Sequence, residues 1–415
     1  MSSLLIKNIE TLVQVDNQSL NAKSPAPLRG KEMASLPLVE GAFLLVESDK
    51  IEDFGKMERC PERASKVVDA SGKMVFPCWC DSHTHLVFAA SREGEFEDKI
   101  KGLSYEEIAR KGGGILNSAK RLQETREEVL VEQALQRLEE VKGYGTGVIE
   151  IKSGYGLTVQ SELKMLRVIQ KLKEFTTMEI KATFLGAHAI PMEFRSKREE
   201  YVSLIINEML PRIAAENLAD YVDVFCEKVA FSVAETEQVI QAAAKFGLKP
   251  KIHTNQFNCM GGIQRSVANG AVSVDHLEVV NQEEMDCLKN SETIATLLPS
   301  APFFLNDPYP PARKLLDAGI PLALATDYNP GSSPSGRMPF VLSLACMKMK
   351  MTPEEAINAA TLNGAAALEL QQDYGSIAKG KIANFFITKP ISSLAYLPYA
   401  FGSDLIERVF IRGKE

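Results

Sequence analysis

Two histidines stand two residues apart in Asp81-Ser-His-Thr-His-Leu86, directly after an apolar run. In a strand, residues i and i+2 point to the same face, so we expect the imidazoles of His83 and His85 to converge. Imidazole is the commonest protein ligand for zinc and also suits iron. Histidines with this spacing also occur as surface or capping residues, so the rest of the chain must decide between these readings.

The other three histidines also follow short apolar runs, which are typical of buried strands. They are His188, His253 and His276, and Asp327 follows the last run of the series. In a barrel of parallel strands, side chains just past the strand ends meet at one face, where the chemistry of such enzymes lies. A carboxylate beside three neutral imidazoles predicts a mixed nitrogen and oxygen site for Zn²⁺ or iron, with room for a water. Asp327 could instead cap a turn before Asn329.

The elements that must position these side chains repeat one pattern from about residue 72 to residue 375. A short apolar run is followed by a polar loop and then by a helical pattern with apolar residues three and four apart. We count eight runs, at 74–80, 147–151, 180–185, 221–225, 250–252, 272–274, 294–298 and 322–325. The clearest helical patterns lie at 125–141, 160–174, 235–246 and 353–369. Eight such units predict an α/β fold, a closed (β/α)8 TIM barrel.

Both ends of the chain are rich in short alternating apolar segments, which predict β-strands. We therefore expect a small composite β-sandwich domain formed by residues 1–73 and 375–415, with the catalytic barrel at 74–374. Residues 17–35 are polar, contain two prolines and predict a loop.

The composition excludes several classes of function. The chain has 415 residues and a net charge of −7, with no long basic run, so neither a nucleic acid nor an anionic membrane is an expected partner. No signal peptide or membrane-spanning stretch is expected. The seven scattered cysteines predict reduced thiols in the cytoplasm, with Cys78 and Cys80 as small buried residues of a strand.

The histidine and aspartate pattern resembles that of the amidohydrolase superfamily, and within it the imidazolonepropionase family of histidine degradation. The resemblance covers essentially the whole chain, and its most specific segments are Lys152-Ser-Gly-Tyr-Gly-Leu157 and Asp327-Tyr-Asn-Pro-Gly-Ser-Ser-Pro334. Further matching segments lie at 81–92, 112–115, 162–167, 185–188 and 223–228.

The resemblance implies one Zn²⁺ or Fe³⁺ per subunit, a small anionic heterocyclic substrate and a homodimer. The implied metal ligands are His83, His85, His253 and Asp327. The implied substrate contacts are Arg92, Tyr105, Tyr155, His188, Gln256, Asn329, Gly331 and Ser332. The implied catalytic groups are Asp327, as the base that accepts a proton from the attacking water, and His276, near the metal-bound water or the attacked carbonyl.

The implied activity is hydrolysis of the cyclic amide of 4-imidazolone-5-propanoate to N-formimidoyl-L-glutamate. Arg92 would grip the substrate carboxylate through charge-assisted bonds. Gln256 stands where some relatives have Glu and cannot take a proton, which leaves that task to Asp327. Lys228 is near the place where two-metal relatives carry a carboxylated lysine, but its spacing predicts a salt bridge instead.

Two other functions stay open from the sequence. A relative could hydrolyse another cyclic amide or deaminate a heterocycle. A metal-free structural barrel would have lost metal ligands, and none of the expected ligands is missing.

Overall fold

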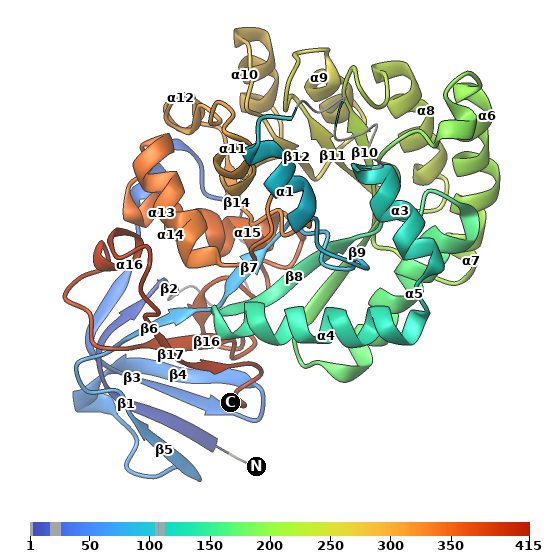
Figure 1. Cartoon of the computed structure of the whole chain (residues 1–415). Helices are drawn as coiled ribbons and strands as arrows, with labels where there is room; N and C mark the ends of the chain where they lie inside the picture. Colours follow the sequence, from blue (N-terminus) through green and yellow to red (C-terminus); the bar gives the residue numbers. More distant parts are fainter. Residues whose placement is uncertain (1–2, 17–25, 104–106, 108–112) are drawn as a thin grey trace.

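Two β-structures organise the chain, a parallel barrel and a smaller sheet beside it (Figure 1). The computed structural model describes residues 3–16, 26–103, 107 and 113–415. Within these residues no helix is long and apolar enough to cross a membrane.

The barrel sheet contains eight parallel strands that are paired in sequence order from β7 to β14. The strands are β7 (Trp79–Asp81), β8 (Thr146–Lys152), β9 (Glu179–Ala187), β10 (Tyr221–Cys226), β11 (Lys249–Thr254), β12 (Ser273–His276), β13 (Ile294–Leu297) and β14 (Leu322–Leu324). Each of the eight predicted runs overlaps one of these strands, so the predicted TIM barrel is confirmed. The strands read as near-continuous apolar runs because helices cover their outer face.

Polar contacts just beyond the strand ends join the first and last strands. The Asp81 carboxylate accepts hydrogen bonds from the backbone N–H of Thr326 at 3.0 Å and from its hydroxyl at 2.6 Å. The amide of Asp327 donates to the carbonyl of His83 at 3.0 Å, and Thr84 pairs with Tyr328 in an isolated bridge. The segment that carries the two histidines is thereby tied to the segment that carries Asp327.

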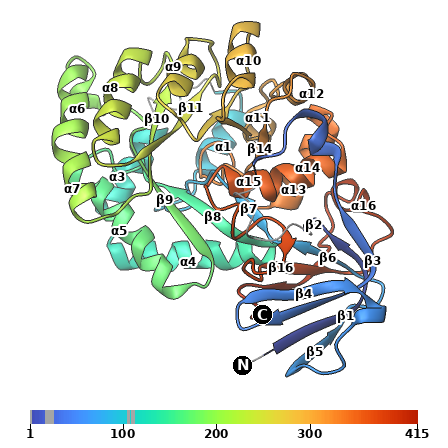
Figure 2. The same cartoon turned by 180° about the vertical axis from the view of Figure 1, so that it is seen from behind.

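Helices form a ring outside the barrel strands (Figures 1 and 2). The α-helices of the described residues are α1 (Glu93–Ile100), α3 (Ile115–Glu124), α4 (Glu127–Gly143), α5 (Val159–Phe175), α6 (Arg198–Leu204), α7 (Leu210–Ala215), α8 (Val233–Ala244), α9 (Gly262–Ala268), α10 (Gln282–Lys289), α11 (Ser300–Leu305), α12 (Ala312–Asp317), α13 (Met338–Met349), α14 (Pro353–Ala360), α15 (Leu362–Ala366) and α16 (Tyr396–Tyr399), which packs on α13. The helix predicted over 353–369 is divided at Thr361, where α14 ends and α15 begins.

The smaller sheet contains strands from both ends of the chain, in the order β17-β16-β6-β1-β3-β4, with β5 paired to β1. Its strands are β1 (Ser3–Val13), β3 (Leu38–Glu47), β4 (Lys50–Lys56), β5 (Lys66–Asp69), β6 (Met74–Pro77), β16 (Phe385–Thr388) and β17 (Ile406–Phe410). A two-stranded sheet pairs β2 (Val15–Asp16) with β15 (Ile377–Ala378). Within the predicted loop over 17–35, the described part contains a short 3-10 helix at Gly30–Ala34.

The prediction of one continuous barrel strand at 74–80 was wrong. Its first half is β6, which pairs with β1 and β16 in the smaller sheet, and only its second half, β7, enters the barrel. Both halves are buried, so the apolar run gave no sign of the break at Cys78. All seven cysteines are unpaired thiols, and Cys78 and Cys80 are buried as expected.

Candidate metal centre and active site

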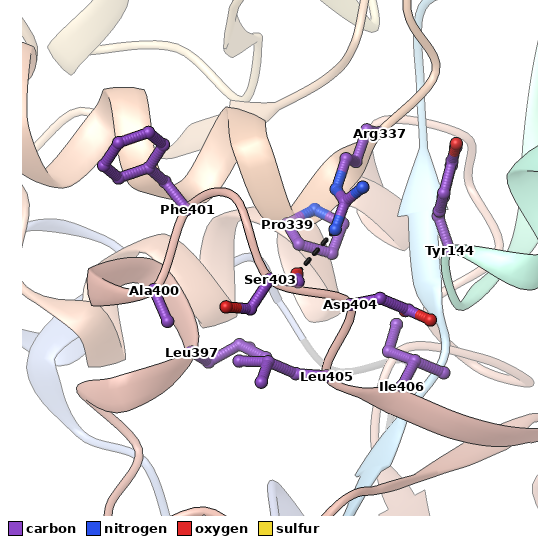
Figure 3. A pocket seen from close by; sticks show the side chains of 10 residues that line it. All are labelled: Tyr144, Arg337, Pro339, Leu397, Ala400, Phe401, Ser403, Asp404, Leu405 and Ile406. Carbon is purple, nitrogen blue, oxygen red and sulfur yellow. Dashed lines mark hydrogen bonds between the residues drawn. The ribbon is translucent and has the colours of Figure 1, made fainter.

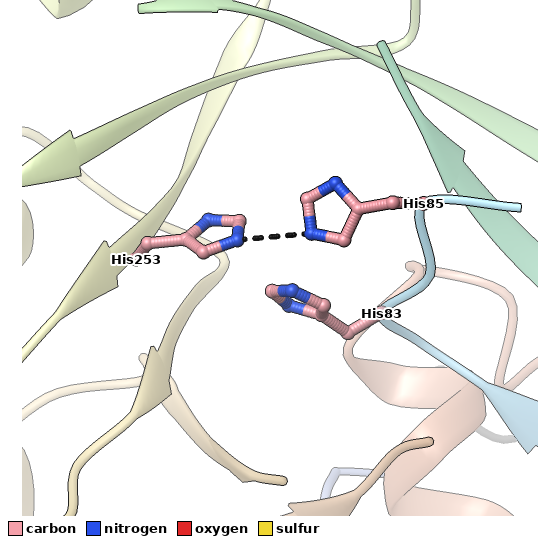
Figure 4. A group of neighbouring side chains, drawn as sticks. All are labelled: His83, His85 and His253. Carbon is pink, nitrogen blue, oxygen red and sulfur yellow. Dashed lines mark hydrogen bonds between the residues drawn. The ribbon is translucent and has the colours of Figure 1, made fainter. Parts of the chain in front are cut away.

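Three imidazoles converge at the carboxyl ends of the barrel strands (Figure 4). His83 and His85 follow β7, and His253 lies in β11. The Nε2 atoms of His253 and His85 are 3.3 Å apart. Oδ1 of Asp327 lies 3.6 Å from Nε2 of His83 and 3.5 Å from Nε2 of His85. The four ligands that the resemblance implies therefore face one point, and all four side chains are buried.

Two further carboxylates fix the orientation of the imidazoles. Nδ1 of His83 lies 2.6 Å from Oδ2 of Asp275, and Nδ1 of His253 lies 2.8 Å from Oδ2 of Asp223. A carboxylate on one ring nitrogen keeps the proton there, which directs the lone pair of the other nitrogen inward and increases its basicity. Neither aspartate was predicted as part of the site. The available signal was an acidic residue inside an otherwise apolar strand.

The arrangement fits a bound cation. With Nδ1 protonated towards Asp275, Nε2 of His83 presents a lone pair towards the Asp327 carboxylate, and this buried nitrogen has no hydrogen-bond partner among the described residues. A lone pair that faces an anion is unfavourable unless a positive charge lies between them. Burial lowers the pKa of His83, His85 and His253, so the rings are neutral, as metal ligation requires.

A second titratable pair, His276 and Glu278, lies beside the ligands. Burial alone would lower the pKa of His276, but Glu278, with Oε1 at 3.3 Å from Nδ1, raises it to about 9. Burial raises the pKa of Asp327 to about 7. His276 can therefore donate a proton, and Asp327 can accept one. The ring of His276 lies beside the metal ligands, with its centroid 5.3 Å from that of His253. Glu278 was not singled out from the sequence.

Tyr155 from the loop after β8 and His188 directly after β9 place two of the predicted substrate contacts against the imidazoles. The ring of Tyr155 lies 5.9 Å from that of His85, and the ring of His188 stacks on His85 at 5.2 Å. Nδ1 of His188 lies 3.0 Å from the carbonyl of Gly154, to which it can donate. Burial lowers the pKa of His188 to about 4 and raises that of Tyr155, so both are neutral near pH 7.

Arg92 and the turn after β14 approach the site from another side. The Arg92 guanidinium is paired with Glu95 and lies so close to Gly331 that a Cβ there would be 2.3 Å from Nη1. Asn329 uses its amide within the turn, donating to the carbonyl of Asp327 and accepting from the amides of Gly331 and Ser332. Asn329 therefore stabilises this turn. These contacts were not predicted, because the resemblance implies only a substrate contact for Asn329.

Three further predicted residues are Gln256, Tyr105 and Lys228. Gln256 is half-buried just after β11, and Tyr105 lies outside the described residues. Lys228 is exposed at the turn after β10, and the predicted salt bridge is not formed with any described carboxylate. The strand-borne lysine of the site is Lys152 instead, whose ammonium lies 2.9 Å from Asp223.

Comparison with known proteins agrees with this geometry. The model of the amidohydrolase family matches residues 74–415. The chain belongs to the amidohydrolase family. Imidazolonepropionase of Flavobacterium johnsoniae is 59% identical over 99% of both chains, and imidazolonepropionase of Christiangramia forsetii is 57% identical over 99% of both. Guanine deaminase of E. coli has the same fold, with a TM-score of 0.74 at 16% identity over 100% of this chain and 99% of that one.

The amidohydrolase family is metal-dependent, and His83, His85 and His253 form the candidate metal site of this member. A second group of possible ligands, His83, Glu150 and Asp275, surrounds the ammonium of Lys152. Because that positive charge already occupies the space between the carboxylates, the second group is an ion-pair cluster.

A separate small cavity lies away from these residues, between α16 and the start of β17 (Figure 3). Arg337 donates to the carbonyl of Ser403 at this cavity. Its lining residues are Tyr144, Arg337, Pro339, Leu397, Ala400, Phe401, Ser403, Asp404, Leu405 and Ile406. Its volume of about 10 Å³ suits one water molecule. None of the predicted site residues that the structure describes lines it.

Proposed function

We propose that this amidohydrolase hydrolyses the cyclic amide of 4-imidazolone-5-propanoate to N-formimidoyl-L-glutamate, a step of L-histidine degradation. The observation that carries the proposal is the buried set of three imidazoles and one carboxylate in a chain that is 59% identical, over its full length, to a protein named imidazolonepropionase. One Zn²⁺ or Fe³⁺ per subunit would be held by His83, His85, His253 and Asp327.

When bound, the cation supplies Lewis acidity, which lowers the pKa of a water and polarises the substrate carbonyl. Asp327 accepts the proton of the water as its oxygen attacks the ring carbonyl carbon. His276, held by Glu278, donates a hydrogen bond to the oxygen that gains negative charge. The bond between the carbonyl carbon and the ring nitrogen then breaks, and Asp327 returns its proton to the leaving nitrogen.

The substrate would lie between the imidazoles and the surrounding loops. Arg92 binds the propanoate carboxylate, assisted by Ser332 and by Gly331, whose lack of a side chain leaves room for the guanidinium. Tyr155, His188 and Gln256 contact the ring, and Asn329 holds the turn that presents Ser332. Tyr105 completes the proposed set of contacts.

The direct test is to incubate the metal-loaded protein with freshly generated imidazolonepropionate and to follow the loss of its ultraviolet absorbance. We expect formimidoylglutamate as product and no direct release of ammonia. Release of ammonia from purines or other heterocycles, without consumption of imidazolonepropionate, would favour the deaminase alternative, whose fold is shared.

Replacement of Asp327 by Asn tests the proposed base. We expect turnover to be lost while substrate binding stays measurable by calorimetry. Near-normal turnover of the Asp327→Asn protein would remove Asp327 from this role.

We further propose that the protein is a cytoplasmic homodimer with a small-molecule substrate as its partner. The unpaired cysteines agree with a reducing compartment. Elemental analysis identifies the native metal, and light scattering of the purified protein measures the oligomeric state.

A further inference from the structure

A buried lysine lies directly beneath the candidate metal centre. Lys152 ends β8, and its side chain is fully buried. Its Nζ lies 3.0 Å from Glu150, 2.9 Å from Oδ2 of Asp223 and 3.6 Å from Oδ2 of Asp275. Neither the resemblance nor the proposed mechanism uses this ammonium.

The oxygens that Lys152 approaches are the same oxygens that orient the metal ligands. Oδ2 of Asp223 is 2.8 Å from Nδ1 of His253, and Oδ2 of Asp275 is 2.6 Å from Nδ1 of His83. One ammonium is therefore shared by two carboxylate–imidazole pairs that come from different strands. All the partners are fully buried apart from His253, which is 3% exposed, so solvent screening is weak.

We propose that Lys152 is a positioning residue of the metal centre, which holds Asp223 and Asp275 together and through them aims Nε2 of His253 and Nε2 of His83 at one cation. Without the ammonium, two buried carboxylates near each other would lose their common counter-charge and would separate. The hydrogen bonds to the two rings would lengthen, and the ring nitrogens would no longer converge.

The other contacts of Lys152 support this assignment. Glu150 approaches the ammonium from its own strand and also accepts a hydrogen bond from the hydroxyl of Thr183 in β9. The backbone amide of Lys152 donates to the carbonyl of Thr84, between the two histidines, at 2.9 Å. Both the main chain and the side chain of Lys152 thus contact groups that place the ligands.

The test is the affinity for the metal, measured on the full-length protein without substrate. Lys152→Met keeps most of the side-chain volume and removes the charge. We expect its dissociation constants for Zn²⁺ and Co²⁺, measured by chelator competition, to rise by about 10- to 100-fold. We also expect the visible absorption bands of the Co²⁺-loaded variant to shift, because they report ligand geometry.

Lys381→Met is the matched control, because Lys381 is also buried, at 2% exposed, but donates to the carbonyls of Gln371 and Tyr374. Its metal affinity and Co²⁺ spectrum should match those of the wild type. Lys152→Gln, which keeps a donor without the charge, serves if the Met variant does not fold, and an intermediate loss of affinity is expected.

A folded Lys152→Met protein that binds both metals within twofold of the wild type would overturn the inference. An equal loss of affinity in Lys381→Met would also overturn it, because the effect would then follow from removing any buried lysine. The inference rests on the metal centre of the proposed function, but its readout does not involve the substrate. If the wild type binds metal but leaves imidazolonepropionate intact, the proposed substrate fails while the metal titrations still decide the role of Lys152.

Discussion

The loop that presents Tyr155 depends on one buried carboxylate, Glu162, near the start of α5. Its Oε1 accepts hydrogen bonds from the amides of Gly156 at 2.7 Å and Leu157 at 2.8 Å, and its Oε2 accepts one from the amide of Gly154 at 3.1 Å. Gly156 packs so closely on α5 that a Cβ would lie 2.4 Å from the backbone nitrogen of Glu162. Replacement of Glu162 by Gln should therefore disturb this loop specifically.

The size of the effect follows from these contacts. A glutamine can keep its oxygen towards Gly156 and Leu157, but its NH2 group then faces the N–H of Gly154. One charge-assisted bond is lost, at a cost of about 1.5–3 kcal/mol, and two become neutral bonds, at a cost of about 0.5–1 kcal/mol each. Burial raises the pKa of Glu162 and the hydrogen bonds lower it, so the neutral amide recovers part of this cost. We expect a net loss of stability of about 2–4 kcal/mol, which leaves the protein folded at 25 °C.

The kinetic effect should exceed what the loss of stability alone would cause. The carbonyl of Gly154 lies within hydrogen-bonding distance of His188, so a shift of the loop moves both Tyr155 and His188 relative to the imidazoles. Misplacement of a substrate-contacting group by about 1 Å can lower the rate about 100-fold. We therefore expect kcat/KM to fall by about 10- to 100-fold with the metal content unchanged. Steady-state kinetics with imidazolonepropionate, elemental analysis and urea denaturation measure the three quantities.

Glu355→Gln provides the control. Glu355 is 4% exposed, accepts from the amide of Thr352 at the start of α14 and pairs with Arg313, remote from the imidazoles. This variant should lose stability while kcat/KM stays within twofold of the wild type. The reasoning is refuted if folded, metal-loaded Glu162→Gln protein also keeps kcat/KM within twofold.

Three further outcomes can be measured. Gly331→Ala should raise KM about tenfold with kcat unchanged, because the new Cβ displaces the Arg92 guanidinium; steady-state kinetics tests this, and an unchanged KM would contradict it. Burial lowers the pKa of Lys381 from 10.5 to about 8 in the folded protein. Between these two pH values the unfolded chain binds one proton more than the folded protein, so the free energy of unfolding of the wild type rises with pH. Measured by urea denaturation, the wild type should gain about 3 kcal/mol of stability over this pH range relative to Lys381→Met. Curves of stability against pH that run parallel for the two proteins would contradict this prediction. Removal of the metal by a chelator should lower the melting temperature and abolish turnover, and Zn²⁺ should restore both.

The barrel was predictable because its strands are buried on both faces and alternate with amphipathic helices. The boundary with the smaller sheet was not, because Met74–Pro77 and Trp79–Asp81 have the same apolar character. Which sheet each strand enters depends on partners about 70 and more than 300 residues away, such as β8 and β16, and no local pattern encodes that pairing.

The ligands of the candidate metal centre were predictable because histidines are rare and all lie at or just past the carboxyl ends of strands. The groups that orient them were missed because Lys, Glu and Asp are common and their pairing exists only in three dimensions. Glu278 and Glu162 follow no predicted strand directly, and only their burial distinguishes them from surface carboxylates.

A sharper signal was nevertheless present in the strands. Side chains that face the barrel interior recur with a period of two, so a ligand at one position marks the interior at the positions two residues before and after it. Such pairs occur in four strands or strand ends, at Asp81 and His83, Glu150 and Lys152, Lys251 and His253, and Ser273 and Asp275, and all eight side chains are buried. Isolated charges would be expelled from a barrel core, whereas these side chains pair with one another, within one strand as in Lys152 and Glu150 or between strands as in Lys251 and Glu150. Polar residues with a period of two inside apolar strands therefore identify the layer that supports a metal centre as well as the centre itself.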